Sequence, residues 1–166
     1  MRTRKLTVLG MGIALYVVLS YTVKIPLINQ IRTDFGYLVF GVFLCIYGWQ
    51  ASVVGVLGCI ISNLLYSGTF PLGWALGQLF IGLFCGWLLP KQKNRVLRCL
   101  TAAIAVLIGI AGIKTIVESV LFNLPLGLKV VRGLVAAVAD LIPFLAGILI
   151  SDRLPVTVEE KKEEKT

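Results

Sequence analysis

Long apolar runs separated by short polar breaks dominate this chain of 166 residues. A helix needs about 20 mostly apolar residues to cross the hydrocarbon core of a bilayer. We predict an all-α membrane protein, a bundle of six transmembrane helices within residues 1–151, followed by a charged, disordered tail over residues 152–166. The six predicted helices are Leu6–Val23, Phe35–Tyr47, Ala51–Tyr66, Leu72–Leu89, Leu100–Phe122 and Val130–Ile150.

The second and third predicted helices are short for a full crossing. Only Gly48, Trp49 and Gln50 separate them, and Ser67, Gly68, Thr69 and Pro71 break the chain after the third. An alternative therefore stays open, in which these two runs form one re-entrant pair and the chain crosses the membrane with five helices.

The composition supports a membrane location. Apolar residues make up 58% of the chain and charged residues only 14%, whereas about 25% are charged in a typical soluble domain. So little polar surface could not cover such an apolar core in water, which excludes a soluble enzyme. The net charge of +8 arises mainly from residues that flank the apolar runs, so we attribute it to topology and expect no nucleic-acid partner.

Lysine and arginine are distributed unevenly between the two ends of the predicted bundle. With six helices both termini share one side, and cytoplasmic segments carry the excess of basic residues. The other side holds only Lys24, Arg32, Lys129 and Arg132. We therefore predict cytoplasmic termini. The eleven basic residues on that side are Arg2, Arg4, Lys5, Lys91, Lys93, Arg95, Arg98, Arg153, Lys161, Lys162 and Lys165.

Polar residues inside the apolar runs gather in the half of the bundle opposite the termini. Ionisable groups in a membrane segment are costly and usually face a cavity or a partner. We predict a substrate-binding pocket that opens outward, with the alternative that Lys114 and Glu118 only neutralise each other and the rest are interface residues. Asp140 lies nearer the middle, and its role stays open. The predicted binding residues are Asp34, Asn63, Trp74, Gln78, Lys114, Glu118 and Arg132.

The sequence offers no motor or catalytic centre of its own. It contains no histidine, no phosphate-binding glycine loop and no metal-ligand cluster, and we interpret its four cysteines as free thiols. We therefore expect no enzyme activity, no cofactor and no metal. Energy for any transport must come from an ion gradient or from a partner subunit.

Gly10 and Ala14 form a pair of small residues four apart on the first predicted helix. Such pairs allow two helix backbones to approach closely. The pair lies in the cytoplasmic half, beside the basic N-terminus. It is a candidate docking surface for another membrane protein, with ordinary packing inside the bundle as the alternative.

Three stretches resemble the S components of energy-coupling factor (ECF) transporters, the bacterial vitamin importers. They are LTVLGMGIALYVVLS, the loop leading into IRTDFGYLVFGVFLCIYGWQASVVGVLGCIISNLLYSG, and PLGWALGQLFIGLFCGWLLPK. The resemblance covers about residues 5–150. It implies a multi-pass subunit of the bacterial cell membrane that binds a vitamin-like small molecule in an outer pocket. It also implies a transmembrane coupling protein and two ATPase subunits as partners.

The resemblance gives the first helix a role in docking. Family members often carry alanines four apart there, and Gly10 and Ala14 match that spacing, with glycine in place of the first alanine. The resemblance does not identify the vitamin. The outer surplus of Lys and Arg suggests an anionic or strongly polar ligand.

Two alternatives of other classes remain at this point. A small envelope scaffold similar to the rod-shape-determining membrane protein D family would have five or six helices and need no outer pocket. A small gradient-driven transporter would need an ion-carrying group, for which Asp140 is the candidate.

Overall fold

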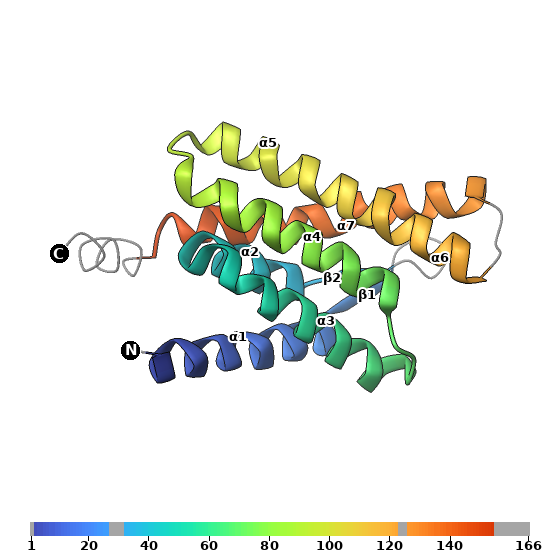
Figure 1. Ribbon diagram of the computed structural model, residues 1–166, viewed down its shortest axis with the longest axis horizontal. Helices are drawn as coiled ribbons and strands as arrows, with labels where there is room; N and C mark the ends of the chain where they lie inside the picture. Colours follow the sequence, from blue (N-terminus) through green and yellow to red (C-terminus); the bar gives the residue numbers. More distant parts are fainter. Residues whose placement is uncertain (1, 27–31, 123–125, 155–166) are drawn as a thin grey trace.

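The computed structural model describes residues 2–26, 32–122 and 126–154 and confirms an all-α membrane architecture (Figure 1). A short antiparallel ribbon of β1 (Lys24–Pro26) and β2 (Arg32–Asp34) joins the first two helices, with Ile25 opposite Thr33. The helices are α1 (Arg2–Thr22), α2 (Gly36–Tyr47), η2 (Gly48–Ala51), α3 (Ser52–Ser67), α4 (Leu72–Leu88), η3 (Leu89–Lys91), α5 (Arg95–Val106), η4 (Leu107–Lys114), α6 (Thr115–Phe122) and α7 (Leu126–Ser151).

The helix bounds differ from the sequence prediction at three places. α1 begins earlier, at Arg2, and α7 begins at Leu126, within the segment that we expected to be a loop. α5 begins at Arg95, in the predicted basic loop, because the Asn94 side chain caps it by accepting a hydrogen bond from the Val96 N–H at 3.0 Å. Most of the predicted charged tail, residues 155–166, lies outside the described residues.

By length and composition, five helical segments of the described residues could cross a membrane. α5, η4 and α6 join into one of them, and α2, η2 and α3 together form another. The five segments are Thr3–Thr22, Gly36–Ser67, Leu72–Lys91, Arg95–Phe122 and Lys129–Ser151.

The segment Gly36–Ser67 reverses direction at Gly48, which has a φ of 58°. A Cβ on Gly36 or on Gly58 would lie 2.5 Å or 2.6 Å from the same ring, that of Tyr16, so the start of α2 lies near the later part of α3. The two helices therefore form a hairpin. α2 has 12 residues, about 18 Å at 1.5 Å per residue, and is short for a crossing.

α2 packs closely against α7, which runs in the same direction (Figure 1). A Cβ on Gly147 would lie only 2.1 Å from the Leu38 carbonyl oxygen, and one on Gly41 would lie 2.6 Å from the Phe144 carbonyl oxygen. These glycines let the two backbones approach. Phe40 and Phe144 lie 5.8 Å apart, centroid to centroid, in the core between the helices.

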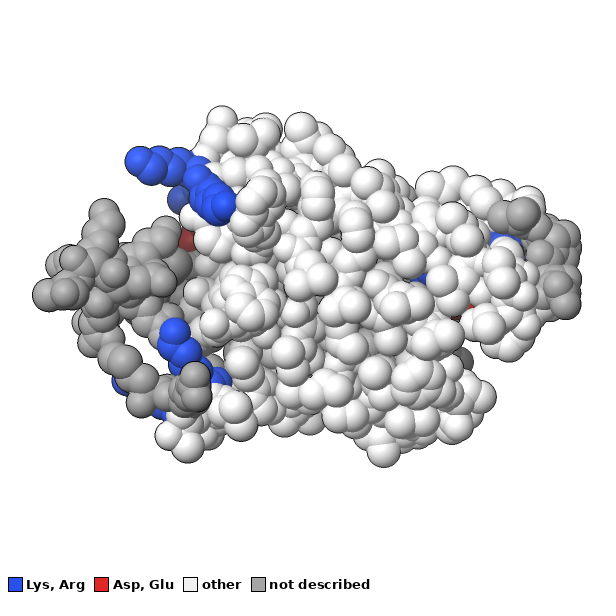
Figure 2. All heavy atoms as spheres, viewed as in Figure 1, with Lys and Arg blue, Asp and Glu red and all other residues white. Residues whose placement is uncertain are grey.

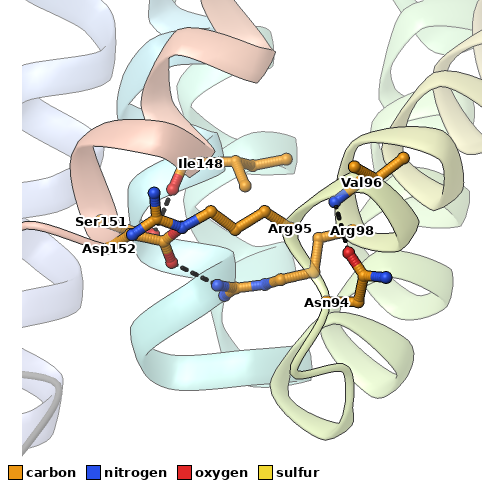
Figure 3. Close-up of polar contacts among 7 residues, drawn as sticks. All are labelled: Asn94, Arg95, Val96, Arg98, Ile148, Ser151 and Asp152. Atoms are coloured by element: carbon orange, nitrogen blue, oxygen red, sulfur yellow. Dashed lines mark hydrogen bonds and ion pairs between the residues drawn. The ribbon is translucent and has the colours of Figure 1, made fainter.

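α5 and α7 are joined at the end of the bundle where α7 ends (Figure 3). Arg98 donates a hydrogen bond to the Asp152 carboxylate, and Arg95 Nε lies 3.3 Å from the other carboxylate oxygen. The side chains of Arg98 and Asp152 are 13% and 15% exposed, so both charges are largely removed from solvent. The carboxylate therefore holds the start of α5 against the end of α7.

Asp152→Ala is expected to lower the thermal unfolding midpoint by about 3–12 °C. A hydrogen bond to a charged group contributes about 1.5–3 kcal/mol, and 1 kcal/mol corresponds to about 2–4 °C in a protein of this size. Arg95→Ala is the matched control and should have a small effect, because the Arg95 side chain is 73% exposed. Equal midpoints for both variants, measured in the same detergent, would contradict a stabilising role for the Arg98 contact.

Candidate ligand site

A layer of hydrogen-bonded polar residues, here called the floor, crosses the bundle near the middle of its length. The Asp34 N–H donates to Asp140 Oδ1 at 2.9 Å. Asp140 follows the first residue of α7 by 14 positions, about 21 Å along the helix. Asp34 and the start of α2 therefore lie deeper than we expected from the sequence, and α2 does not reach the half of the bundle in which α7 begins.

Hydrogen bonds between five elements hold the floor together. Gln78 Nε2 on α4 donates to the Tyr16 hydroxyl on α1 at 3.1 Å, and this hydroxyl donates to Asp34 Oδ2 at 3.4 Å. Asp34 Oδ1 accepts from the Gly36 N–H at 2.8 Å. With the contact from Asp34 to Asp140 on α7, one network links α1, α2, α4, β2 and α7.

Three buried polar atoms of this region have no hydrogen-bond partner among the described residues: Tyr37 Oη, Gln78 Oε1 and Asp140 Oδ2. The three residues are at most 1% exposed. Buried polar atoms are almost always hydrogen-bonded, because an unpaired one costs free energy. These atoms are therefore suited to bind a polar ligand or an ordered water.

Above the floor, a charged cluster lies against an aromatic ring. Lys114 Nζ lies 4.5 Å from the centroid of Trp74 and 3.5 Å from Glu118 Oε2, and Lys129 Nζ lies 3.0 Å from the same oxygen. Lys114 is only 8% exposed. The cluster combines a buried cation, a carboxylate and an aromatic face, a combination that can hold a polar aromatic molecule.

The backbone brings Lys114 to α4. η4 is a π-helical segment, and the side-chain hydroxyl of Thr115, the residue directly after it, donates to the Ile110 carbonyl oxygen at 3.2 Å. Gly77 lets η4 approach, since a Cβ there would lie 2.7 Å from the Gly109 carbonyl oxygen. Such π segments inside helices occur frequently at functional sites.

Five of the seven predicted site residues belong either to the floor or to the charged cluster. Asp34 and Gln78 belong to the floor, and Trp74, Lys114 and Glu118 form the cluster above it. The Asn63 amide instead donates to the Cys59 carbonyl oxygen of its own helix at 2.9 Å. Arg132 has an exposed side chain in the first half of α7.

Sequence reasoning missed Tyr16, Tyr37 and Lys129 as members of this region. One signal could have found Tyr16, because Gly12, Tyr16 and Ser20 recur every four residues and all three are buried. No local pattern marks Tyr37 at the start of α2. Among the described residues no group of His, Cys, Asp or Glu could hold a metal ion.

The opposite face of α1 carries the predicted docking residues. Gly10 and Ala14 are both exposed, and a Cβ on Gly10 would meet nothing within 4 Å. Met11 and Val18 on this helix are 66% and 54% exposed. α1 therefore exposes an apolar surface whose centre is formed by the small residues Gly10 and Ala14.

Comparison with solved structures identifies the fold. The S component for biotin from an ECF-type ABC transporter superposes with a TM-score of 0.72 at 17% identity, over 92% of this chain and 90% of that chain. FolT bound with folic acid superposes with a TM-score of 0.74 at 18% identity, over 95% of this chain and 97% of that chain. These likenesses show the S-component fold. A search of curated proteins gave no match.

A family model gives the family itself. The model described as "ECF-type riboflavin transporter, S component" matches residues 1–154, which include every described helix. This assignment excludes the envelope scaffold and the gradient-driven transporter that the sequence had left open. The chain therefore belongs to the family of ECF-type riboflavin transporter S components and is the substrate-binding subunit of an ECF-type vitamin importer.

Proposed function

We propose that this subunit captures riboflavin from outside a bacterial cell and presents it for uptake driven by partner ATPases. Riboflavin is the substrate in the family's description, and the likeness to the biotin and folate proteins concerns the fold. The observation that carries the proposal is the set of unpartnered buried atoms on Tyr37, Gln78 and Asp140.

The chemistry of these atoms suits a flavin. A flavin is a flat aromatic system with an imide edge that presents one N–H donor between two carbonyl acceptors. Gln78 Oε1 and Asp140 Oδ2 can accept hydrogen bonds, while the Tyr37 hydroxyl can donate one. An imide edge needs one acceptor and two donors, so one of the two acceptors would bind its N–H, while the Tyr37 hydroxyl and the Lys114 ammonium group would donate to its carbonyl oxygens. The fused rings would stack on Trp74.

The charge balance of the cluster is compatible with a neutral ligand. Glu118 lies within 3.5 Å of Lys114 Nζ and 3.0 Å of Lys129 Nζ, so one carboxylate offsets part of the positive charge of both lysines. The surplus of outer basic residues, which suggested an anionic ligand from the sequence, is smaller at the site. A polar ligand without net charge could accept a hydrogen bond from an N–H of Lys114 that Glu118 does not use.

A fluorescence titration of the purified protein tests the proposal. Flavin fluorescence should be quenched on binding next to Trp74, and the titration should saturate at one flavin per chain. Biotin, folate and thiamine serve as competitors and should not displace riboflavin at equal concentration. Displacement by one of them, or binding of that vitamin with no response to riboflavin, would reject riboflavin as the substrate.

We further propose six membrane crossings with both termini in the cytoplasm, in the bacterial plasma membrane. α1 begins and α7 ends at the same end of the bundle (Figure 1), and lysine and arginine gather mainly at that end (Figure 2). The reversal at Gly48 gives α2 and α3 opposite directions, as two crossings require. α2 is short because the ribbon before it enters the outer half of the bundle.

Reporter fusions test this topology. A cytoplasm-specific reporter after Thr166 should be active, and the same reporter inserted between residues 123 and 129 should be inactive. The opposite pattern would invert the orientation. Activity at both positions would contradict the single crossing that we propose between the insertion and the C-terminus.

A further inference from the structure

We infer that Tyr16 is a positioning residue, which fixes Asp34 and the start of α2 as the floor of the ligand site and ties α1 to that floor. Only the riboflavin measurements that test this inference rest on the proposed function. Tyr16 itself lies beneath the proposed ligand and acts through Asp34.

The ring of Tyr16 is enclosed by backbone that only glycine permits. A Cβ on Gly36 would lie 2.5 Å from its Cε1 atom, and a Cβ on Gly58 would lie 2.6 Å from its Cδ1 atom. Tyr16 is fully buried. The ring is therefore held between α2 and α3 in one position, which also fixes the position of its hydroxyl group.

The Tyr16 hydroxyl forms two hydrogen bonds. It accepts from Gln78 Nε2 at 3.1 Å and donates to Asp34 Oδ2 at 3.4 Å. The bond from Gln78 uses its amide donor and leaves Oε1 unpaired, as one of the acceptors proposed for the ligand. The Tyr16 hydroxyl thereby links Gln78 to Asp34.

Asp34 in turn connects the Tyr16 hydroxyl to the backbone at the start of α2 and to α7. Its other carboxylate oxygen accepts from the Gly36 N–H at 2.8 Å, and its own N–H donates to Asp140 Oδ1 at 2.9 Å. Asp140 Oδ2 is the second unpaired acceptor. Among the contacts described for the Asp34 carboxylate, Tyr16 supplies the one that is distant in the sequence, so the Tyr16 hydroxyl of α1 helps to fix where β2 meets α7.

The test is Tyr16→Phe, which retains the ring and removes the hydroxyl. Amide hydrogen exchange of the segment 32–38 should become about 3- to 10-fold faster, while exchange in the middle of α4 and α7 stays unchanged. Riboflavin dissociation should accelerate by a similar factor, as expected for the loss of one net hydrogen bond. Tyr21→Phe is the matched control on the same helix, because Tyr21 is 54% exposed, and it should change neither rate.

A double-mutant cycle shows whether Tyr16 acts through Asp34. Adding Tyr16→Phe to Asp34→Ala should change riboflavin dissociation by less than 2-fold, whereas adding it to Trp74→Ala should multiply the two effects. Unchanged exchange at 32–38, exchange that rises in every helix, or multiplicative effects with Asp34→Ala would each overturn the inference. Hydrogen exchange needs no ligand, so a failure to bind riboflavin would reject the proposed substrate and leave the role of Tyr16 to be decided by exchange.

Discussion

Lys114→Met is expected to weaken riboflavin binding by about 10- to 100-fold. Lys114 is 8% exposed and lies 4.5 Å from the Trp74 ring centroid, so its ammonium group is a buried donor beside the surface on which the flavin would stack. A hydrogen bond from a charged group is worth about 1.5–3 kcal/mol, and 1.4 kcal/mol is a factor of 10. Methionine retains the length and the apolar stem, so the loss should be in affinity rather than in folding. Isothermal titration in detergent measures it.

Two controls make the result interpretable. Lys114→Ala combined with Glu118→Ala removes both charges and should bind as weakly as Lys114→Met, without leaving Glu118 to depend on Lys129 alone. Asn63→Ala should bind within 2-fold of the wild type, since the Asn63 amide bonds the Cys59 carbonyl oxygen of its own helix. Wild-type affinity in both Lys114 variants would mean that the cluster is a structural ion pair outside the ligand site.

Arg132→Ala separates a neutral ligand from an anionic one. The side chain is exposed, so it should matter little for riboflavin and considerably for a ligand that carries a carboxylate or phosphate. A loss of affinity greater than that of Asn63→Ala would favour an anionic ligand, as the surplus of outer Lys and Arg first suggested.

Ala14→Leu or Gly10→Leu should reduce riboflavin uptake by cells more than 10-fold and leave binding to the isolated subunit unchanged. We propose that this face of α1 docks on the transmembrane coupling protein of the importer, whose two ATPases supply the energy. Both positions are exposed, and the empty space around the Gly10 Cβ position means that leucine fits the isolated fold. A bulky side chain would instead separate two helices that need backbone contact.

Co-purification of the variants with the coupling protein and ATPases locates the defect. The complex should be recovered poorly from the α1 variants and normally from Gly127→Leu, which places the same side chain at another exposed helical glycine. Full recovery of the complex from both α1 variants would show that the partner docks on a different surface.

The sequence predicted the helices well because long apolar runs end at strong breakers, such as the Ser67–Pro71 segment. It also predicted the pairing of Lys114 with Glu118, since residues four apart share one helix face. Both features depend on local spacing, which a single sequence displays directly.

Depth was harder to predict than helix position. We placed Asp34 near the outer surface by assuming that each run crosses completely, whereas its N–H bonds Asp140, 106 positions away in the chain. Tyr16 was overlooked for a related reason, because a tyrosine in an apolar run resembles a lipid-facing residue until Gln78 and Asp34 are found beside its hydroxyl. Both arrangements are set by contacts between helices that are distant in the sequence, and only the four-residue recurrence of Gly12, Tyr16 and Ser20 gave a local sign of one of them.

The most direct test of the account is mass spectrometry of the small molecule that co-purifies with the protein. The subunit would be expressed in riboflavin-containing medium, washed in detergent and denatured to release its ligand. We predict about one riboflavin per chain from the wild type and at least 10-fold less from Lys114→Met prepared in parallel. Release of a different vitamin, or equal amounts of riboflavin from the two proteins, would contradict a riboflavin site built around Trp74 and Lys114.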